Sequence, residues 1–533
     1  MAFVQAMKLG INGAEVYTEK GVGDYRVTLF TMLNRGLEEK YIEDSVAQFF
    51  NRDISSTLSN ELRDLYVMTF QTRDVRGGKG EKLLFYQLIA ALYKHDKETV
   101  SLMIRLIPEY GCWRDLWELH KRIPELESVI IEFTRESFQL DFAKFQVNKP
   151  LSLLSKWLPR EKSVYKGLAQ KLADAIYNLE LCSRKRIIMY RKDVSMMNKY
   201  LKTVEVNMCG GAWASINPEA VPGRCLKDHT KAFLNKKLTC DEIRYPYEDR
   251  IECREHFKEF IEDLKTGKKA HGANVIMPHE LVAKAMKRDT SLEEHAINQA
   301  QWESIRNETL RLGGLGKSIA MCDFSGSMDG IPKLVSLALG ILISEITHDS
   351  FKDTILTFES RPTWHSFTGT LKEKLDSIGD ISQGTSTDFY YACMCIIKKM
   401  KEHKVPIGEE PEDLIVLTDM GFDEVIDEVI DKQNKWSTQI QDIREEYKKA
   451  GEEVWGLEKA WKPPRIIIWN IRAAFKDFHA TAHEEGVVQL SGWSSSMLKA
   501  LQNGIYVNTP YEGFRTIIDN PRYDKVRDIF ERA

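Results

Sequence analysis

KSIAMCDFSGSM, residues 317–328, is the stretch that decides the fold of the second half of this chain. Its apolar part, Ser318–Cys322, is typical of a short buried strand. Beyond it, Ile331–Ile346 is predicted to form an apolar helix with Pro332 in its first turn, where a missing N–H group costs little. The stretch therefore predicts a strand-loop-helix unit.

The loop of that unit carries Asp323, Ser325 and Ser327, spaced two residues apart. This spacing places one carboxylate and two hydroxyls on the same side of the loop. Hard cations such as Mg²⁺ prefer oxygen ligands in near-octahedral geometry. The motif Asp-x-Ser-x-Ser is common by chance, but it is much less common between a buried strand and an apolar helix.

Two later loops extend the pattern. A second buried strand, Asp413–Leu417, ends in Thr418 and Asp419, and a Thr-rich loop at 383–388 precedes a predicted helix. The order of these parts resembles the metal-ion-dependent adhesion site of von Willebrand factor A domains. Carried over residue by residue, the resemblance implies the metal ligands Asp323, Ser325, Ser327, Thr387 and Asp419. Thr385 is the alternative to Thr387, and helix capping by Ser, Thr and Asp is the alternative to metal binding.

The donor set also indicates which metal to expect. All five implied ligands are oxygens, which favours Mg²⁺, with Mn²⁺ or Ca²⁺ as alternatives. In the family that the motif resembles, the metal keeps an open position for an acidic group from a partner. We therefore expect a protein partner whose acidic residue completes the site.

The rest of the C-terminal half alternates strands and helices, which predicts a doubly wound, Rossmann-like α/β domain with a mostly parallel sheet. An antiparallel edge strand is expected near Thr363–Phe367. The other predicted strands are Ser318–Cys322, Thr354–Phe358, Asp413–Leu417, Arg465–Trp469 and Gly486–Leu490. Ligands of such sheets bind beyond the carboxyl ends of the strands, where Asp323 and Asp419 fall.

The N-terminal half has the periodicity of many short helices with few strand signals, which predicts an α-helical repeat domain of the HEAT type. Residues 1–36 contain Gly10, Gly13, Gly21 and Gly23 and show little periodicity, and we expect an irregular arm there. The predicted domains are thus the arm at 1–36, the helical repeats at 37–312, and the von Willebrand A-like domain at 313–533.

Composition indicates a protein outside the membrane and outside the secretory pathway. The 533 residues contain no apolar stretch of 18 or more residues and no visible signal peptide. The nine cysteines are scattered without a CxxC pair, which favours reduced thiols. We expect a cytoplasmic location, or a place in the virion if the protein is viral, and the sequence leaves the oligomeric state open.

Basic side chains concentrate in the helical half. Residues 142–202 hold fourteen Lys and Arg against four Asp and Glu, and such a stretch either attracts phosphate backbones or forms a solvated helical face. A glycine-rich turn, RDVRGGKGEK at 73–82, lacks the spacing of a phosphate-binding loop, and we expect it to expose its cations. The candidate RNA contacts are Arg73, Arg76, Lys79, Lys156, Arg160, Arg184, Lys185, Arg186, Arg191 and Lys192.

A wider match covers the chain from about Leu58 onward. In order, the segments RDVRGGKGEK with FYQ, SKWLPR, MPHEL, MCDFSGSM, LALGILISE, TFES, GTSTDF, LTDMGFDE, IIIWNIR and GVVQLSGWSSSML resemble domain-of-unknown-function family 2828 of plants, fungi and giant viruses. The architecture is similar to that of the Ro ribonucleoproteins of the TROVE type, which bind small structured RNAs on a basic helical ring. The resemblance implies metal binding and RNA binding.

These patterns favour a binding scaffold that is not an enzyme. Its metal site would engage an acidic partner group, and its helical domain would hold RNA or protein. The alternatives are a structural or assembly protein of a viral particle or large complex, and a metal-dependent phosphohydrolase. The last is disfavoured because no nucleophile with an obvious base accompanies the metal motif.

Overall fold

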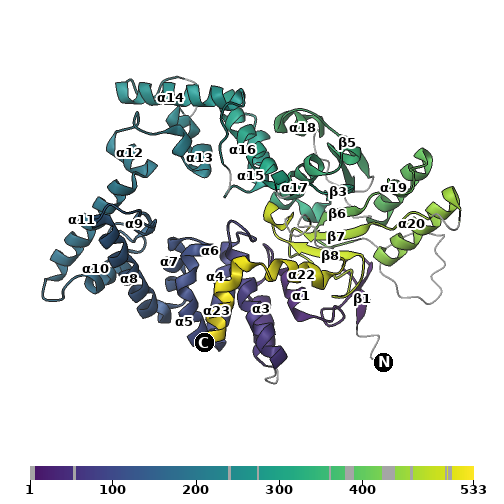
Figure 1. Ribbon diagram of the computed structural model, residues 1–533, viewed down its shortest axis with the longest axis horizontal. Coiled ribbons are helices and arrows are strands. Elements are labelled where there is room, and N and C mark those ends of the chain that lie inside the picture. Colours follow the sequence, from purple (N-terminus) through teal and green to yellow (C-terminus); the bar gives the residue numbers. More distant parts are fainter. Residues whose placement is uncertain are drawn as a thin grey trace.

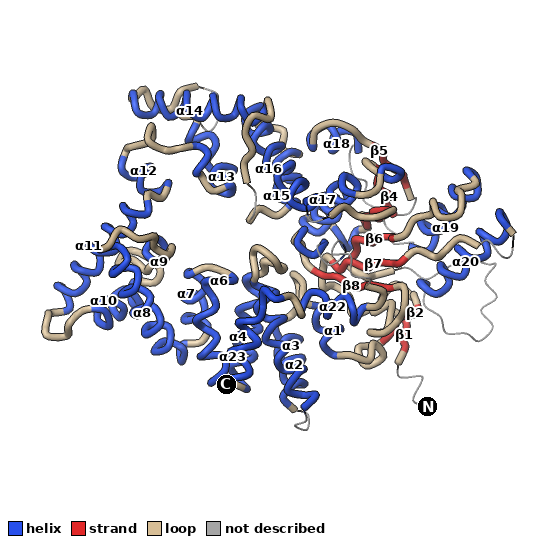
Figure 2. Tube along the Cα trace, viewed as in Figure 1, coloured by secondary structure: helices blue, strands red, loops and turns tan. Residues whose placement is uncertain are grey.

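The computed structural model describes residues 6–51, 56–237, 240, 242–272, 275–311, 313–358, 362–378, 389–422, 439–456, 460–498, 501 and 507–533. A long arc of helices leaves the α/β half of the molecule on one side and returns to it on the other (Figure 1). Figure 2, coloured by secondary structure, shows the strands of the larger sheet together at one end of the molecule.

The α/β half is built on a six-stranded sheet with the order β5-β4-β3-β6-β7-β8. All neighbours pair in parallel except the edge strand β5, which runs antiparallel to β4. The predicted strands and the antiparallel edge are therefore confirmed. Their bounds are β3 Ser318–Asp323, β4 Thr354–Phe358, β5 Thr363–Ser366, β6 Asp413–Thr418, β7 Arg465–Asn470 and β8 Val487–Ser491.

Every residue of β3, β6 and β8 is buried, as expected for parallel strands that helices cover on both faces. The predicted helix Ile331–Ile346 is α17, which packs against β3. The other helices of this half are α18 Leu371–Ile378, α19 Phe389–His403, α20 Gln439–Trp455, α22 Pro510–Ile518 and α23 Asp524–Arg532. The predicted helix at 424–434 lies outside the described residues.

The N-terminal residues do not form an irregular arm, and that prediction is wrong for residues 6–36. They contain a small hairpin, β1 Met7–Leu9 and β2 Glu15–Tyr17, and the helix α1 Tyr25–Met32. The Tyr17 amide donates to the Phe478 carbonyl at 2.7 Å, and α1 packs against β8. Periodicity missed this structure because such short elements depend on contacts with the distant α/β half.

The helical half begins with α2 Glu39–Phe50 and α3 Ser56–Arg73 and continues through many short helices, as predicted. The remaining bounds are α4 Lys82–His95, α5 Lys97–Met103, α6 Ile107–Tyr110, α7 Trp113–Arg122, α8 Glu127–Gln146, α9 Leu154–Trp157, α10 Lys166–Ile176, α11 Ser183–Leu201, α12 Val204–Gly210, α13 Gly223–Phe233, α14 Glu248–Lys265, α15 Pro278–Ala285 and α16 Leu292–Arg311.

One continuous hydrophobic core runs from the first helices of the arc through the sheet. A smaller core around Phe233 and Phe257, whose rings stack at 4.4 Å between centroids, serves the α12–α14 segment and α16. The last helix, α23, leaves the α/β half and packs against α3 and α5. No helix in the described part of the chain is long and apolar enough to cross a membrane.

Candidate functional site

The predicted metal loops meet at the carboxyl ends of β3 and β6. The two strands are parallel neighbours, with Cys322 opposite Leu417, so Asp323 and Asp419 come from adjacent strand ends. Both residues are fully buried, and Ser325 is nearly so. A loop that follows a buried parallel strand thus places its polar groups where ligands of α/β sheets bind.

Short hydrogen bonds fix the first loop. The Ser325 amide donates to Asp323 Oδ1 at 2.9 Å, and the hydroxyls of Ser325 and Ser327 lie 3.1 Å apart. The Thr418 hydroxyl donates to Asp323 Oδ2 at 2.7 Å, and this contact ties the β3 loop to the end of β6. Asp323, Ser325 and Ser327 are therefore brought together, as the sequence predicted.

Two buried carboxylates in one place carry an electrostatic cost. Burial and the nearby charge of Asp419 raise the pKa of Asp323 to about 7, although hydrogen bonds from Ser325 and Thr418 oppose the shift. Burial also raises the pKa of Asp419, and the Ser327 hydroxyl and the Arg472 charge oppose it. A cation between the carboxylates would relieve this cost, because it stabilises both charged forms.

Asp419 also has an unused acceptor. The Gly421 amide donates to its Oδ1 at 3.3 Å, whereas its buried Oδ2 has no hydrogen-bond partner among the described residues. Buried carboxylate oxygens normally have partners. Carboxylate and hydroxyl oxygens are the ligands that hard divalent cations prefer, so the residues present fit a Mg²⁺ ion.

The described residues supply only part of the implied ligand set. Thr387 and its alternative Thr385 lie outside the described residues, so their positions stay a prediction. Within the described ranges, no group of three or more His, Cys, Asp or Glu side chains could hold a metal ion. A metal at this site would thus depend on hydroxyl oxygens as well as on Asp323 and Asp419.

Sequence reasoning missed two polar groups at this site. The sequence assigns Thr418 only to the end of a strand, yet its hydroxyl donates a hydrogen bond to Asp323. Arg472, two residues beyond the end of β7, donates to the Ser327 carbonyl and so braces the first loop from the strand on the other side of β6. The position of Arg472 shortly after the predicted strand Arg465–Trp469 was the available signal.

The glycine-rich turn at 73–82 joins α3 to α4, but the prediction that it exposes its cations is wrong for Arg73 and Lys79. Arg73 is 2% exposed and pairs with buried Asp115 at 2.8 Å. Gly111 permits this approach, since a Cβ atom there would lie 2.2 Å from Asp115 Oδ2. Of the three predicted cations of this turn, only Arg76 is exposed.

Lys79 joins three distant parts of the chain. Its ammonium donates to the carbonyls of Phe30 and Leu33, at 2.8 and 2.9 Å, and to the Ser491 hydroxyl at 2.6 Å. Burial lowers the pKa of Lys79 well below its ordinary value, against the opposing charge of Glu81. These contacts explain the sequence GGKG: Gly78 lies too close to the Gln71 carbonyl for any side chain, and Gly80 has φ of 73°.

The other predicted RNA contacts differ in their partners and in their exposure. Lys156, Arg186 and Arg191 form ion pairs with Glu205, Asp174 and Glu161, and half-buried Arg160 donates to the Ser155 carbonyl. Four of these cations are exposed on α11: Arg184, Lys185, Lys192 and the ion-paired Arg191.

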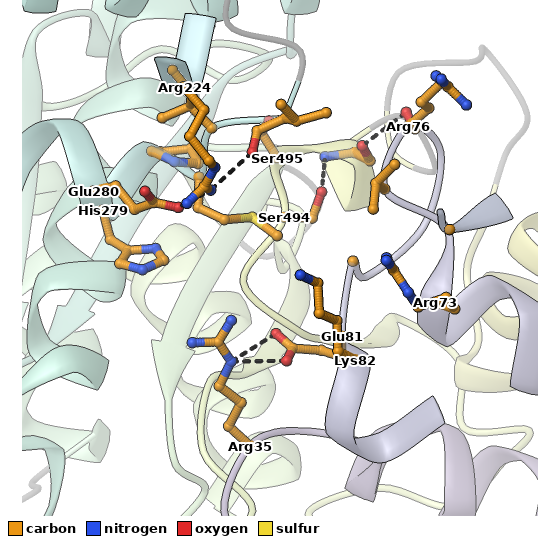
Figure 3. A pocket seen from close by; sticks show the side chains of 18 of the residues that line it. Arg35, Arg73, Arg76, Glu81, Lys82, Arg224, His279, Glu280, Ser494 and Ser495 are labelled. Atoms are coloured by element: carbon orange, nitrogen blue, oxygen red, sulfur yellow. Dashed lines mark hydrogen bonds and ion pairs between the residues drawn. The ribbon is translucent and has the colours of Figure 1, made fainter. Parts of the chain in front are cut away.

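A cavity of about 1200 Å³ was not predicted. It lies between the two halves, and its lining comes from the α3–α4 turn, α15, α16 and the serines that follow β8 (Figure 3). His279, in the first turn of α15, is only 8% exposed and lines this cavity. We call it the seam pocket.

Comparison with known proteins identifies two family models along the chain. Residues 139–315 match the family described as Domain of unknown function (DUF2828), and residues 317–524 match Domain of unknown function (DUF7788). The chain is also 26% identical to Uncharacterized protein L728 of Acanthamoeba polyphaga mimivirus over 459 residues, 81% of this chain and 75% of the viral protein. The C-terminal segments that we assigned to family 2828 thus fall within the second model.

Proposed function

We propose that the protein, which matches the DUF2828 model over residues 139–315, is a metal-dependent binding scaffold and not an enzyme. The α/β half would hold a divalent cation, Mg²⁺ first, at the ends of β3 and β6. The cation would take an acidic group from a protein partner. The helical half would hold RNA or protein.

One observation carries the proposal. Asp323 and Asp419 are fully buried beside each other, and Asp419 Oδ2 has no partner among the described residues. Two neighbouring buried carboxylates repel each other and are costly even with the hydrogen bonds that Ser325, Thr418 and Gly421 donate to them. A Ser or Asn at either position would fill a purely structural role with a smaller free-energy cost of burial.

The sheet topology supports a von Willebrand A-like fold for this half. The order β5-β4-β3-β6-β7-β8 has one antiparallel edge strand and places β3 and β6 at its centre. The chain leaves β3 toward one side of the sheet and crosses to β6 afterwards, so a crevice opens between their carboxyl ends. That is the position of the adhesion motif in the family that the loops resemble.

Arg472 and Ser327 favour binding over catalysis. Arg472 is engaged with the Ser327 carbonyl, and Ser325 and Ser327 face each other rather than a base. Among the described residues at this site, no His lies within hydrogen-bond reach of either hydroxyl. A bound cation would supply electrostatic attraction for a carboxylate, and the protein's own residues would orient it.

Calorimetric titration of Mg²⁺ into the purified protein tests the metal claim. We expect binding by the wild type and by Asp329→Asn, which alters an exposed carboxylate of the same loop, and no binding by the Asp323→Ala, Ser325→Ala double variant. A double variant that is folded and still binds Mg²⁺ with unchanged affinity would contradict the proposal.

The RNA part of the proposal rests on α11. Its exposed cations would contact phosphates without reading sequence, so affinity for a structured RNA should fall steeply with salt. We expect Arg184→Ala with Lys185→Ala to weaken binding of a small hairpin RNA and to reduce the salt dependence. No binding of structured RNA by the wild type at low salt would leave protein as the ligand of the helical half.

A further inference from the structure

The seam pocket contains polar atoms that the fold does not satisfy. Arg73 Nη1, Gln87 Oε1 and His279 Nδ1 are buried, line the pocket and have no hydrogen-bond partner among the described residues. Native proteins rarely leave such groups unpaired. Three in one cavity, from α3, α4 and α15, indicate a place for a polar ligand.

The guanidinium of Arg73 has only some of its N–H groups engaged in hydrogen bonds. Its Nε and Nη2 atoms engage Asp115, with the Nε contact at 2.8 Å, and this pair holds the side chain rigidly. Its Nη1 is left over, and Figure 3 shows the guanidinium extending from α3 toward the open space. A preorganised buried Arg with a spare N–H group is well suited to bind an anion.

Lys82 supplies a second cation at the same place. It is exposed, lines the pocket and forms no ion pair within the described part of the chain. The charges of Arg73 and Lys82 both oppose the burial that raises the pKa of the Cys112 thiol, so both act on one region of the lining. In Figure 3 the Lys82 ammonium points into the space that Arg73 borders.

Two other cations of the lining are paired with acidic groups. Arg35 contacts both oxygens of Glu81, at 2.9 and 2.8 Å, and Arg224 pairs with Glu280 at 2.6 Å. Arg76, at the exposed edge of the pocket, donates to the Glu109 carbonyl and adds its charge to that of Lys82. The positive charge available to a ligand therefore comes from Lys82 and Arg76, with the spare N–H group of Arg73 beside them, and this favours one compact anionic group.

We propose that the seam pocket binds a small organic phosphate of nucleotide size. Its phosphate would contact Arg73 Nη1 and the Lys82 ammonium, because phosphate has enough acceptor oxygens for donors that approach from two directions. A hydroxyl or amino group would donate to Gln87 Oε1. Apolar lining from Leu84, Trp157 and Ile305 would cover the organic part.

The volume agrees with this assignment. Pockets for small ligands occupy roughly 300–1,000 Å³, and about 1200 Å³ is ample for a mononucleotide with its water. His279 is neutral near pH 7, because burial lowers its pKa to about 4. It would therefore offer a neutral hydrogen-bonding group to the ligand. None of the residues that line the pocket belongs to the proposed metal site, so the two sites can fail independently.

Calorimetry with defined probes tests the proposal. Each of the four nucleoside 5′-monophosphates, the matching nucleosides and inorganic phosphate are titrated into wild type, Lys82→Ala, Lys82→Arg and Lys448→Ala. Lys448 is an exposed lysine of α20 that lies outside both the pocket and the proposed RNA-binding surface. We expect at least one monophosphate to bind, its nucleoside to bind about tenfold more weakly or worse, Lys82→Ala to lose about tenfold in affinity, and Lys82→Arg to retain most of it.

Three outcomes would overturn the proposal. The first is no binding of any monophosphate at millimolar concentration. The second is equal affinity in Lys82→Ala and Lys448→Ala, which would place the ligand elsewhere. The third is a single-stranded oligonucleotide that binds through Lys82 far more tightly than every mononucleotide, which would assign the pocket to a nucleic-acid segment.

Discussion

At the residue scale, two buried cationic side chains connect distant parts of the chain. Lys79 and Arg73 are buried cations in a turn that the sequence predicts to be exposed, and the contacts of both connect distant parts of the fold. Sequence could not reveal this, because Lys79 bonds Ser491, 412 residues away. The signal that remained was GGKG itself, since closely spaced glycines mark a backbone under steric constraint.

Lys79→Met should destabilise the protein strongly. It removes the donor to the Leu33 carbonyl and one donor each from the Phe30 carbonyl and the Ser491 hydroxyl, which still bond each other. A buried group left unsatisfied costs roughly 1–3 kcal/mol. We expect a loss of at least ~2 kcal/mol in the free energy of unfolding, measured by urea denaturation. Arg76→Met, in the same turn but exposed, should change it by less than about 0.5 kcal/mol. Equal effects of the two substitutions would contradict the role given to Lys79.

A buried histidine should make stability depend on pH. His479 is fully buried, bonds the Met420 carbonyl at 2.9 Å and stacks on Phe422, and burial lowers its pKa to about 4. The unfolded chain binds a proton near pH 6.5 and the folded protein does not. The stability that His479 contributes is thus complete above pH 6.5 and is lost as the pH falls toward 4.

The corresponding measurement is the free energy of unfolding between pH 7.5 and 4. For His479→Gln we expect a flatter profile than for the wild type, by about 3 kcal/mol at pH 4. His403→Gln, which alters an exposed side chain at the end of α19, should reproduce the wild-type slope. A wild-type slope in His479→Gln would show that this imidazole is not held neutral.

At the scale of elements, the strands of the α/β half could be predicted from the sequence, whereas the elements that the two chain ends add to the fold could not. β3, β6 and β7 are short apolar runs whose burial is local information, so their positions followed from sequence. The hairpin β1–β2, α1 and α23 have weak local signals and are stabilised by distant surfaces. In the candidate site, the same logic identified Asp323 and Asp419 but not Arg472, whose partner Ser327 is 145 residues away.

The contact of α17 with the sheet is close enough to exclude a methyl group. A Cβ atom at Gly340 would lie 2.3 Å from the Cys322 Sγ. Gly340→Ala should therefore lower the thermal midpoint, with a cost of about 1–3 kcal/mol from overpacking. Gly210→Ala on α12, where no atom lies within 4 Å, should be neutral or stabilising. A neutral Gly340→Ala would show that α17 can move away from β3.

At the scale of the whole molecule, the arc of helices and the sheet share one core, and both chain ends cross between the halves. The N-terminal residues lie on the sheet, whereas α23 lies on α3 and α5 (Figure 1). The predicted boundary near residue 313 marks the change from helices to the α/β pattern, but the packing does not divide there. This arrangement positions the seam pocket.

A substitution at Arg522 tests how strongly the C-terminal segment is held against the helical half. It forms a two-pronged ion pair with Asp74, which is fully buried. Arg522→Ala would leave that carboxylate with the Arg76 amide and the Tyr523 hydroxyl but without its charged partner. We expect a cost of about 3 kcal/mol, seen as a lower midpoint of urea unfolding. Lys525→Ala breaks an exposed pair with Glu109 and should cost under about 1 kcal/mol. A small effect of Arg522→Ala would mean that α23 is dispensable.

The central claim is that the ends of β3 and β6 hold a divalent cation. The most direct measurement is anomalous diffraction from crystals of the protein grown with Mn²⁺, collected above and below the manganese absorption edge. The claim predicts an anomalous peak in contact with Asp323, Ser325, Ser327 and Asp419. A peak only at other residues, or none at this site at saturating Mn²⁺, would contradict it.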